Sequence, residues 1–159
     1  MPKFARRAGR YLFLIAAVTA VIFVARGRAP SSSETHFAGK PELIAATFSS
    51  AWCSSCMILK PRLAKAIPAL AGKPVKFVEY DFTFGERPEL KSAAEADGLA
   101  AVYDRYAGSA GFTLLINADT GAIIEILTIN YSAKAMRSAI GAALAKATPP
   151  EGIDPYKDG

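Results

Sequence analysis

Apolar residues occur along this chain in short runs and in longer periodic stretches, separated by proline, glycine and charged positions. Short runs bounded by such breakers predict strands, whereas stretches with apolar residues three or four positions apart predict helices. The pattern gives the order strand, helix, strand, helix, strand, strand, helix. The predicted strands are 43–48, 74–81, 112–116 and 122–128, and the predicted helices are 54–71, 88–106 and 132–147.

Prolines and a glycine interrupt these helical stretches. Pro61 lacks an N–H and clashes with the preceding turn, so the first helix is expected to kink over 57–60 and to continue beyond it. Pro68 is expected to end that helix early, and Gly98 to divide the second one. Ser132 is expected to cap the last helix.

The first 28 residues have a different pattern. Four basic residues lie within the first ten, and an uninterrupted apolar stretch of 15 residues, 11–25, follows them. Such a segment is an export signal or a membrane anchor. Its apolar stretch is short for a membrane span and long for the core of a signal peptide. Because 26–30 contain arginines and a proline instead of a small-residue cleavage site, an uncleaved anchor is favoured. More basic residues before the stretch than after it predict a single-pass protein of the cytoplasmic (inner) membrane whose domain faces the periplasm.

The rest of the chain divides into three parts. Residues 29–40 are polar and rich in serine, which is typical of a linker. Residues 41–147 contain all the predicted strands and helices and are long enough for one ordinary core. Residues 148–159 have no periodicity and are expected to be mobile.

The net charge of the predicted domain does not indicate a charged partner. The chain carries a net charge of +5, but six of its basic residues belong to the N-terminal segment, which leaves 13 basic against 14 acidic residues. Since no basic stripe with interleaved aromatic residues is present, nucleic-acid binding is not expected.

The two cysteines of the chain, Cys53 and Cys56, follow the first predicted strand and open the first predicted helix. This spacing and position are typical of a redox dithiol. A disulfide that closes so small a loop stabilises a fold little. The N-terminus of a helix favours a thiolate, so Cys53 is expected to attack a substrate and Cys56 to resolve the mixed disulfide. A structural zinc site would need about four ligands, more than this chain supplies; two inert core thiols are the other alternative.

Several residues near the cysteines have counterparts in a known family. Trp52 directly precedes the first cysteine, and Pro61 follows the second by five residues. Gly111 and Thr113 begin a Leu-Leu-Ile strand that leads into an Asp-Thr-Gly turn. Together with the element order, these features make residues 41–147 resemble the thioredoxin superfamily, and the whole chain resembles its membrane-anchored thiol–disulfide oxidoreductases.

The resemblance implies a three-layer α/β sandwich, with a central mixed sheet and helices on both faces. It also implies an enzyme that acts on protein dithiols and disulfides through Cys53 and Cys56, without a cofactor or a bound metal. Outside the cytoplasm such a protein, working as a reductant, would draw electrons from a membrane reductase. The residues that the resemblance assigns to substrate binding are Trp52, Gly111, Phe112 and Thr113.

Two positions depart from the family's pattern. Phe112 stands where thioredoxins have a cis-proline, and since a cis bond before another residue costs about 2.5–4 kcal/mol, a trans bond is expected. Thr47 stands where the family has a buried acid that relays a proton for the second cysteine, and Phe77 where that acid has a lysine partner. Threonine is no base near neutral pH, so the proton would pass through water or through Glu79. Glu79 and Asp81 are themselves expected to be solvated strand-end residues.

These departures leave a different class of function open, namely a copper carrier or a redox-sensing binding module on the same fold. His36 lies before the first strand and is expected to be a solvated linker residue, not a copper ligand. The aromatic residues Phe77, Tyr80, Phe82 and Phe84 are expected to pack in the core and loops, with a partner-binding patch as the alternative. Ser54 and Ser55 carry no charge that would set the direction of electron transfer, so reductant and oxidant both remain open.

Overall fold

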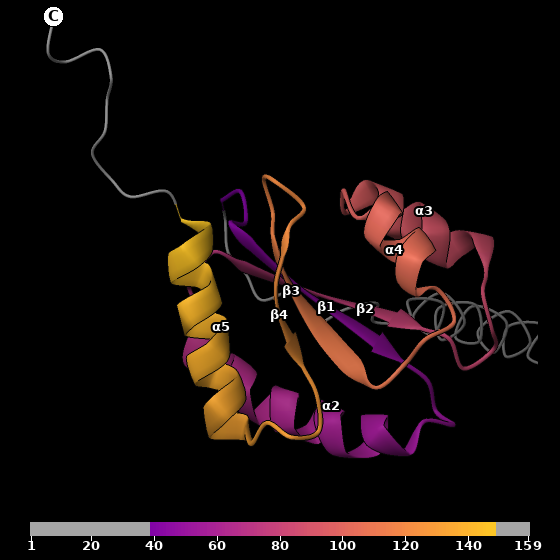
Figure 1. Ribbon diagram of the computed structural model, residues 1–159, viewed down its shortest axis with the longest axis horizontal. Helices are drawn as coiled ribbons and strands as arrows, with labels where there is room; N and C mark the ends of the chain where they lie inside the picture. The colour runs from indigo at the N-terminus through magenta and orange to yellow at the C-terminus, as the bar shows by residue number, and fades with distance from the viewer. Residues whose placement is uncertain (1–38, 149–159) are drawn as a thin grey trace, which may run out of the picture. The chain divides into compact units, whose positions relative to one another are not determined.

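The computed structural model describes residues 39–148 (Figure 1). The predicted membrane anchor, most of the predicted linker with His36, and residues 149–159 of the predicted tail lie outside the described residues. None of the helices within 39–148 combines the length and the apolar character needed to cross a bilayer.

The predicted order of strands and helices is confirmed over this range. The elements are β1 (Leu43–Ser49), α2 (Ser54–Ala66), the 3₁₀ helix η1 (Ile67–Leu70), β2 (Val75–Asp81), α3 (Pro88–Ala96), α4 (Ala100–Tyr106), β3 (Phe112–Asn117), β4 (Ile123–Leu127) and α5 (Ala133–Ala147).

The strands form one mixed sheet in the order β2-β1-β3-β4. β1 pairs in parallel with β2 and antiparallel with β3, and β3 pairs antiparallel with β4. β1 is therefore an inner strand, and all seven of its residues are buried. This explains why its sequence is an unbroken apolar run and does not alternate.

Helices cover both faces of the sheet, with α2 and α5 on one side and α3 and α4 on the other (Figure 1). Alternate residues of β1 point to opposite faces. Leu43 and Ala45 pack in the core under α2 and α5, whereas Ile44, Ala46 and Phe48 pack in the core under α3 and α4. The predicted three-layer α/β sandwich is confirmed.

The predicted helix breaks are also found, with one refinement. The first helix ends at Ala66 and passes into the 3₁₀ helix that contains Pro68, while Gly98, with a φ of +73°, separates α3 from α4. The helix is continuous through Pro61. Ser132 caps α5 by accepting a hydrogen bond from the amide of Ala135 at 3.2 Å.

Candidate functional site

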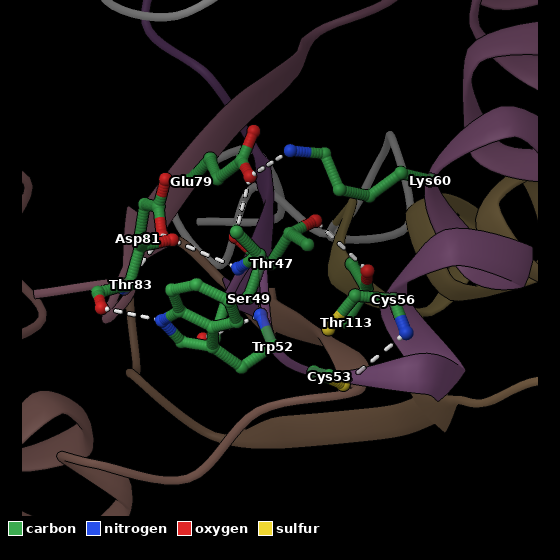
Figure 2. Close-up of polar contacts among 12 residues, drawn as sticks. Thr47, Ser49, Trp52, Cys53, Cys56, Lys60, Glu79, Asp81, Thr83 and Thr113 are labelled. Carbon is green, nitrogen blue, oxygen red and sulfur yellow. Dashed lines mark hydrogen bonds and ion pairs between the residues drawn. The ribbon is translucent and has the colours of Figure 1, made fainter.

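Both cysteines lie where β1 gives way to α2 (Figure 2). Cys53 is the N-cap of α2, and its sulfur accepts a hydrogen bond from the amide of Cys56 at 3.2 Å. Cys53 is half-buried, whereas Cys56 is only 2% exposed. Both are free thiols in this structure. An incoming disulfide therefore meets Cys53 first, and Cys56 lies within the helix directly behind it.

The environment of Cys56 keeps its thiol protonated. Burial raises the pKa of Cys56, and the hydrogen-bonding contact with Cys53 raises it further. A hydrogen bond with the backbone of Ser50 lowers it, and the positive charge of Lys60 lowers it by less. Reactivity with disulfides requires the thiolate. In the reduced protein, the burial of Cys56 and its raised pKa both lower the reactivity of this thiol.

Trp52 forms the rim of the site. Its side chain is 82% exposed, and the indole Nε1 donates a hydrogen bond to the carbonyl of Thr83 at 3.1 Å. The hydroxyl of Thr83 accepts from the amide of Ala51 at 2.8 Å. These two bonds join the cysteine loop to the loop after β2, where Phe84 is 79% exposed. The expected packing is therefore found for Phe77, Tyr80 and Phe82, which are buried, whereas Phe84 is exposed in its loop.

Gly111 lies where a side chain would crowd the half-buried sulfur of Cys53. Its amide donates to the carbonyl of Phe48 at 2.9 Å, which fixes the β3 loop to the end of β1. Its φ is +104°, a conformation that side chains rarely adopt. A Cβ at this position would lie 3.4 Å from the Cys53 sulfur and 3.2 Å from Cβ of Ser55. Only glycine fits here without moving the cysteine loop, which is consistent with the predicted place of Gly111 beside a substrate.

The side chains of Phe112 and Thr113 pack against partners within the domain. No peptide bond in residues 39–148 is cis, so the expected trans bond before Phe112 is found. The Phe112 ring is half-buried and stacks on Phe48 at a centroid distance of 5.2 Å. Thr113 is completely buried, and its hydroxyl pairs with that of Thr47 at 2.8 Å. The Thr113 side chain therefore cannot reach a substrate, and only its backbone remains available for the predicted contact.

A polar cluster of Ser49, Lys60 and Glu79 was not expected beside the cysteines. One carboxylate oxygen of Glu79 accepts from Ser49 Oγ at 2.5 Å and from Lys60 Nζ at 2.6 Å (Figure 2). Glu79 lies at the surface as expected, yet its carboxylate is bound twice. The sequence holds one signal for this cluster: Lys60 follows Cys56 by four residues, which places both on one face of a helix. No local pattern in the sequence indicates that Ser49 belongs to this cluster, because its contact with Glu79 depends on the pairing of β1 with β2.

Asp81 organises the loop at the end of β2. Its carboxylate accepts hydrogen bonds from the amide and the hydroxyl of Thr83. Burial alone would raise the pKa of Asp81, but these two bonds outweigh it and the pKa is lowered. The residue predicted to be merely solvated therefore positions the loop that holds Trp52.

No group of three or more histidine, cysteine or acidic side chains able to hold a metal ion occurs among residues 39–148. Cys53 and Cys56 are the only thiols of the chain.

Comparisons with known proteins give structural similarities only. No protein-family model matches the chain, and neither does any curated protein. StoA from Bacillus subtilis is 17% identical, with a TM-score of 0.45, 64% of this chain covered and 84% of that one. A thiol:disulfide interchange protein of the thioredoxin family from Chlorobium tepidum is 16% identical, with a TM-score of 0.45 and coverages of 74% and 99%. Thioredoxin f2 from Chlamydomonas reinhardtii is 19% identical, with a TM-score of 0.40 and coverages of 72% and 86%.

The fold class of the domain is defined by its strand order, its strand directions and the helices on both faces of its sheet. The chain has a thioredoxin-like fold, with a Cys-x-x-Cys pair at the first turn from strand to helix.

Proposed function

We propose that this protein is a thiol–disulfide oxidoreductase that acts on protein dithiols and disulfides. One observation carries the proposal: a half-buried cysteine caps a helix, and a second cysteine that is 2% exposed donates its amide to the first sulfur at 3.2 Å. This arrangement gives the two thiols different access and different tasks. It supports an attacking sulfur at the surface and a resolving sulfur behind it.

The exchange proceeds in two displacements when the protein acts as a reductant. The Cys53 thiolate attacks one sulfur of a substrate disulfide, so that a mixed disulfide forms and the first substrate sulfur leaves as a thiolate, which takes up a proton. Cys56 then loses its proton, and its thiolate attacks the Cys53 sulfur. The Cys53–Cys56 disulfide forms and the second substrate thiol is released. Two electrons have moved to the substrate, and the same steps in reverse oxidise a dithiol.

Exposed apolar side chains in the cysteine loop, in the loop after β2 and in the first turn of α2 support a protein as the substrate. Trp52 is 82% exposed, Phe84 is 79% exposed and Met57 is 73% exposed. Exposed apolar groups of this size often mark sites of interaction with other proteins. The contacts to a substrate would come from Trp52 and from the backbone of the Gly111 loop.

We also propose that the domain is anchored in the cytoplasmic membrane and faces the periplasm. The basic residues followed by 15 apolar residues at the N-terminus support this proposal. A membrane-impermeant maleimide should therefore label Cys53 in cells whose outer membrane alone has been opened, once the thiols are reduced. Labelling only after the inner membrane is lysed would place the domain on the other side.

The catalytic proposal is tested by a redox titration of the full chain in detergent against a dithiol buffer, with the metal content measured on the same sample. We expect a metal-free protein with a reversible two-electron couple. The reduction potentials of known proteins with this fold span about −270 to −120 mV. The potential of this protein would tell whether it donates or accepts electrons. Stoichiometric copper held by the reduced thiols, without a reversible couple, would favour the metal carrier instead.

A further inference from the structure

Helices α2 and α5 carry basic side chains and, within their bounds, no acidic one: Lys60, Arg62 and Lys65 in α2, and Lys134, Arg137 and Lys146 in α5. We propose that the outer surface formed by these side chains, the basic face, binds the anionic headgroups of the bilayer in which the chain is anchored. The inference deepens the proposed function and rests on the membrane anchoring proposed there, since it concerns how the domain is held at the membrane.

The two helices belong to one side of the domain. Both cover the same face of the sheet and pack on the same core (Figure 1). Arg62 joins them further, because its guanidinium donates to the carbonyls of Ile129 and Tyr131, in the segment that leads into α5. Arg62 is half-buried, and the other basic side chains of the two helices are exposed. Their positive charges therefore act together on the solvent at this side.

The other side of the domain has the opposite balance of charge. Helices α3 and α4 and the turn between them carry more acidic than basic side chains: Glu89, Glu95, Asp97 and Asp104 against Lys91 and Arg105. The near-neutral net charge of the domain thus hides a separation of charge between its two faces. A charged surface feels local charge more than net charge, because salt screens interactions beyond about 10 Å.

Most of the positive charge of the basic face has no acidic partner within the domain. Lys60 binds Glu79 at 2.6 Å. The remaining basic side chains of the face form no ion pair among residues 39–148: Arg62, Lys65, Lys134, Arg137 and Lys146. Glu125, on the neighbouring edge strand β4, is bound by the hydroxyl of Tyr131. The basic face is therefore open to an anionic partner from outside the domain.

Exposed apolar side chains accompany these charges. Ile58 is 43% exposed and lies one turn before Arg62, on the same face of α2. Ile129, whose carbonyl accepts from Arg62, is 38% exposed. A surface that combines basic and apolar side chains suits the boundary between lipid headgroups and acyl chains. The combination favours a bilayer over a nucleic acid, whose charged backbone offers aliphatic side chains little to bind.

The N-terminal segment brings a membrane within reach of the domain. Basic residues and 15 apolar residues in 1–28 support an anchor, and only residues 29–40 separate that segment from the domain. A linker of this length spans at most about 40 Å when fully extended. Such a tether keeps the basic face at a high effective concentration near the lipids, so that a weak attraction suffices. Binding through this face would hold Cys53, the N-cap of α2, at the membrane surface, within reach of a membrane-bound electron donor or acceptor.

The test is lysine footprinting of the full chain in lipid nanodiscs, which leave both sides of the bilayer open to a reagent. A water-soluble succinimidyl ester acylates exposed lysines, and mass spectrometry gives the rate at each one. With phosphatidylglycerol as about a third of the lipid, Lys65, Lys134 and Lys146 should react at least about 3-fold more slowly than in pure phosphatidylcholine. Salt at about 0.5 M should remove the difference, because it shortens the screening length to about 4 Å. Lys91, on the opposite side of the sheet, should react equally in both lipids.

A double variant tests whether the basic face itself is responsible. Lys65→Gln combined with Lys134→Gln removes two charges from the face and leaves Lys146 as the reporter. Since each basic side chain near an anionic surface strengthens the attraction roughly 5-fold, the protection of Lys146 by phosphatidylglycerol should disappear.

Lys76→Gln combined with Lys91→Gln is the matched control. It changes the net charge by the same amount, but both lysines pair with acidic residues on the side of α3 and α4. Exposed ion pairs of this kind stabilise a fold little, so the domain should stay folded. In this variant the protection of Lys146 should persist.

Three results would overturn the inference. The first is equal acylation in the two lipids, and the second is an equal loss of protection in the two double variants, which would mean that net charge alone attracts the domain. The third is protection by soluble polyglutamate without any effect of phosphatidylglycerol, which would assign the face to an acidic macromolecule.

Failure of the proposed anchor can be told apart from failure of the inference. A chain that does not enter nanodiscs of pure phosphatidylcholine lacks the anchor. Salt-dependent protection of Lys65 and Lys134 by added phosphatidylglycerol vesicles would then still support the basic face, and its absence would overturn it. Neither readout depends on disulfide exchange, so a chain that exchanges no disulfides would contradict the oxidoreductase proposal alone.

Discussion

Replacing Cys56 with serine is expected to turn the protein into a trap that holds a substrate as a mixed disulfide on Cys53. Cys53 keeps its access to solvent, but the sulfur that would release the substrate is gone. Reduction of a disulfide-bonded test protein such as insulin should fall on the order of 10³-fold or more, and the adduct should appear in non-reducing electrophoresis and mass spectrometry. Cys53→Ser should lose the activity to the same extent and form no adduct.

Ser54→Ala is the matched control for this pair. Ser54 is exposed, lies between the two cysteines and is the first residue of α2. It should turn over insulin at close to the parent rate. Unchanged turnover by Cys56→Ser would contradict a two-thiol mechanism, and an adduct in Cys53→Ser would mean that the buried cysteine is the attacking one.

Gly111→Ala is expected to reduce both the stability and the reactivity of the site. The added methyl group would meet the Cys53 sulfur at 3.4 Å and Ser55 at 3.2 Å, in a backbone conformation with a φ of +104°. The left-handed conformation costs about 1–2 kcal/mol and the crowding about 1–3 kcal/mol, so we expect a loss of about 2–5 kcal/mol in the free energy of unfolding. Chemical denaturation measures that loss, and the rate of Cys53 alkylation reports on access to the sulfur.

Gly72→Ala separates the two contributions. Gly72 has a φ of +77°, and a Cβ there would meet nothing within 4 Å. This variant should lose only the conformational part, about 1–2 kcal/mol, and should alkylate Cys53 at the parent rate. Equal losses of stability in the two variants, with equal alkylation rates, would contradict the close packing of Gly111 on the cysteine loop.

Local patterns in the sequence were enough to predict the secondary structure. Pro68 and Gly98 marked the ends of helices because the conformational restrictions of proline and glycine act within one turn. Ser132 was identifiable as an N-cap for the same reason, since its hydroxyl accepts from an amide three residues away. The place of the two cysteines at a helix start also followed from the sequence, because Cys53 and Cys56 directly follow the first predicted strand.

The tertiary structure decided which side chains surround those cysteines. The motif assigns Thr113 to substrate binding, but the pairing of β1 with β3 buries its side chain against Thr47. The resemblance assigns Phe112 to substrate binding, and the structure shows that its half-buried ring stacks on Phe48.

The sequence by itself determined the order of the strands and helices and the redox-type spacing of Cys53 and Cys56, because both depend on neighbours within one or two turns. Only the tertiary structure showed that a Cβ at position 111 would crowd the Cys53 sulfur and that Glu79 binds Lys60. Those contacts join residues on separate strands, helices and loops of the domain. Their partners are set by strand register and by which face of the sheet each helix covers, and no local pattern encodes either.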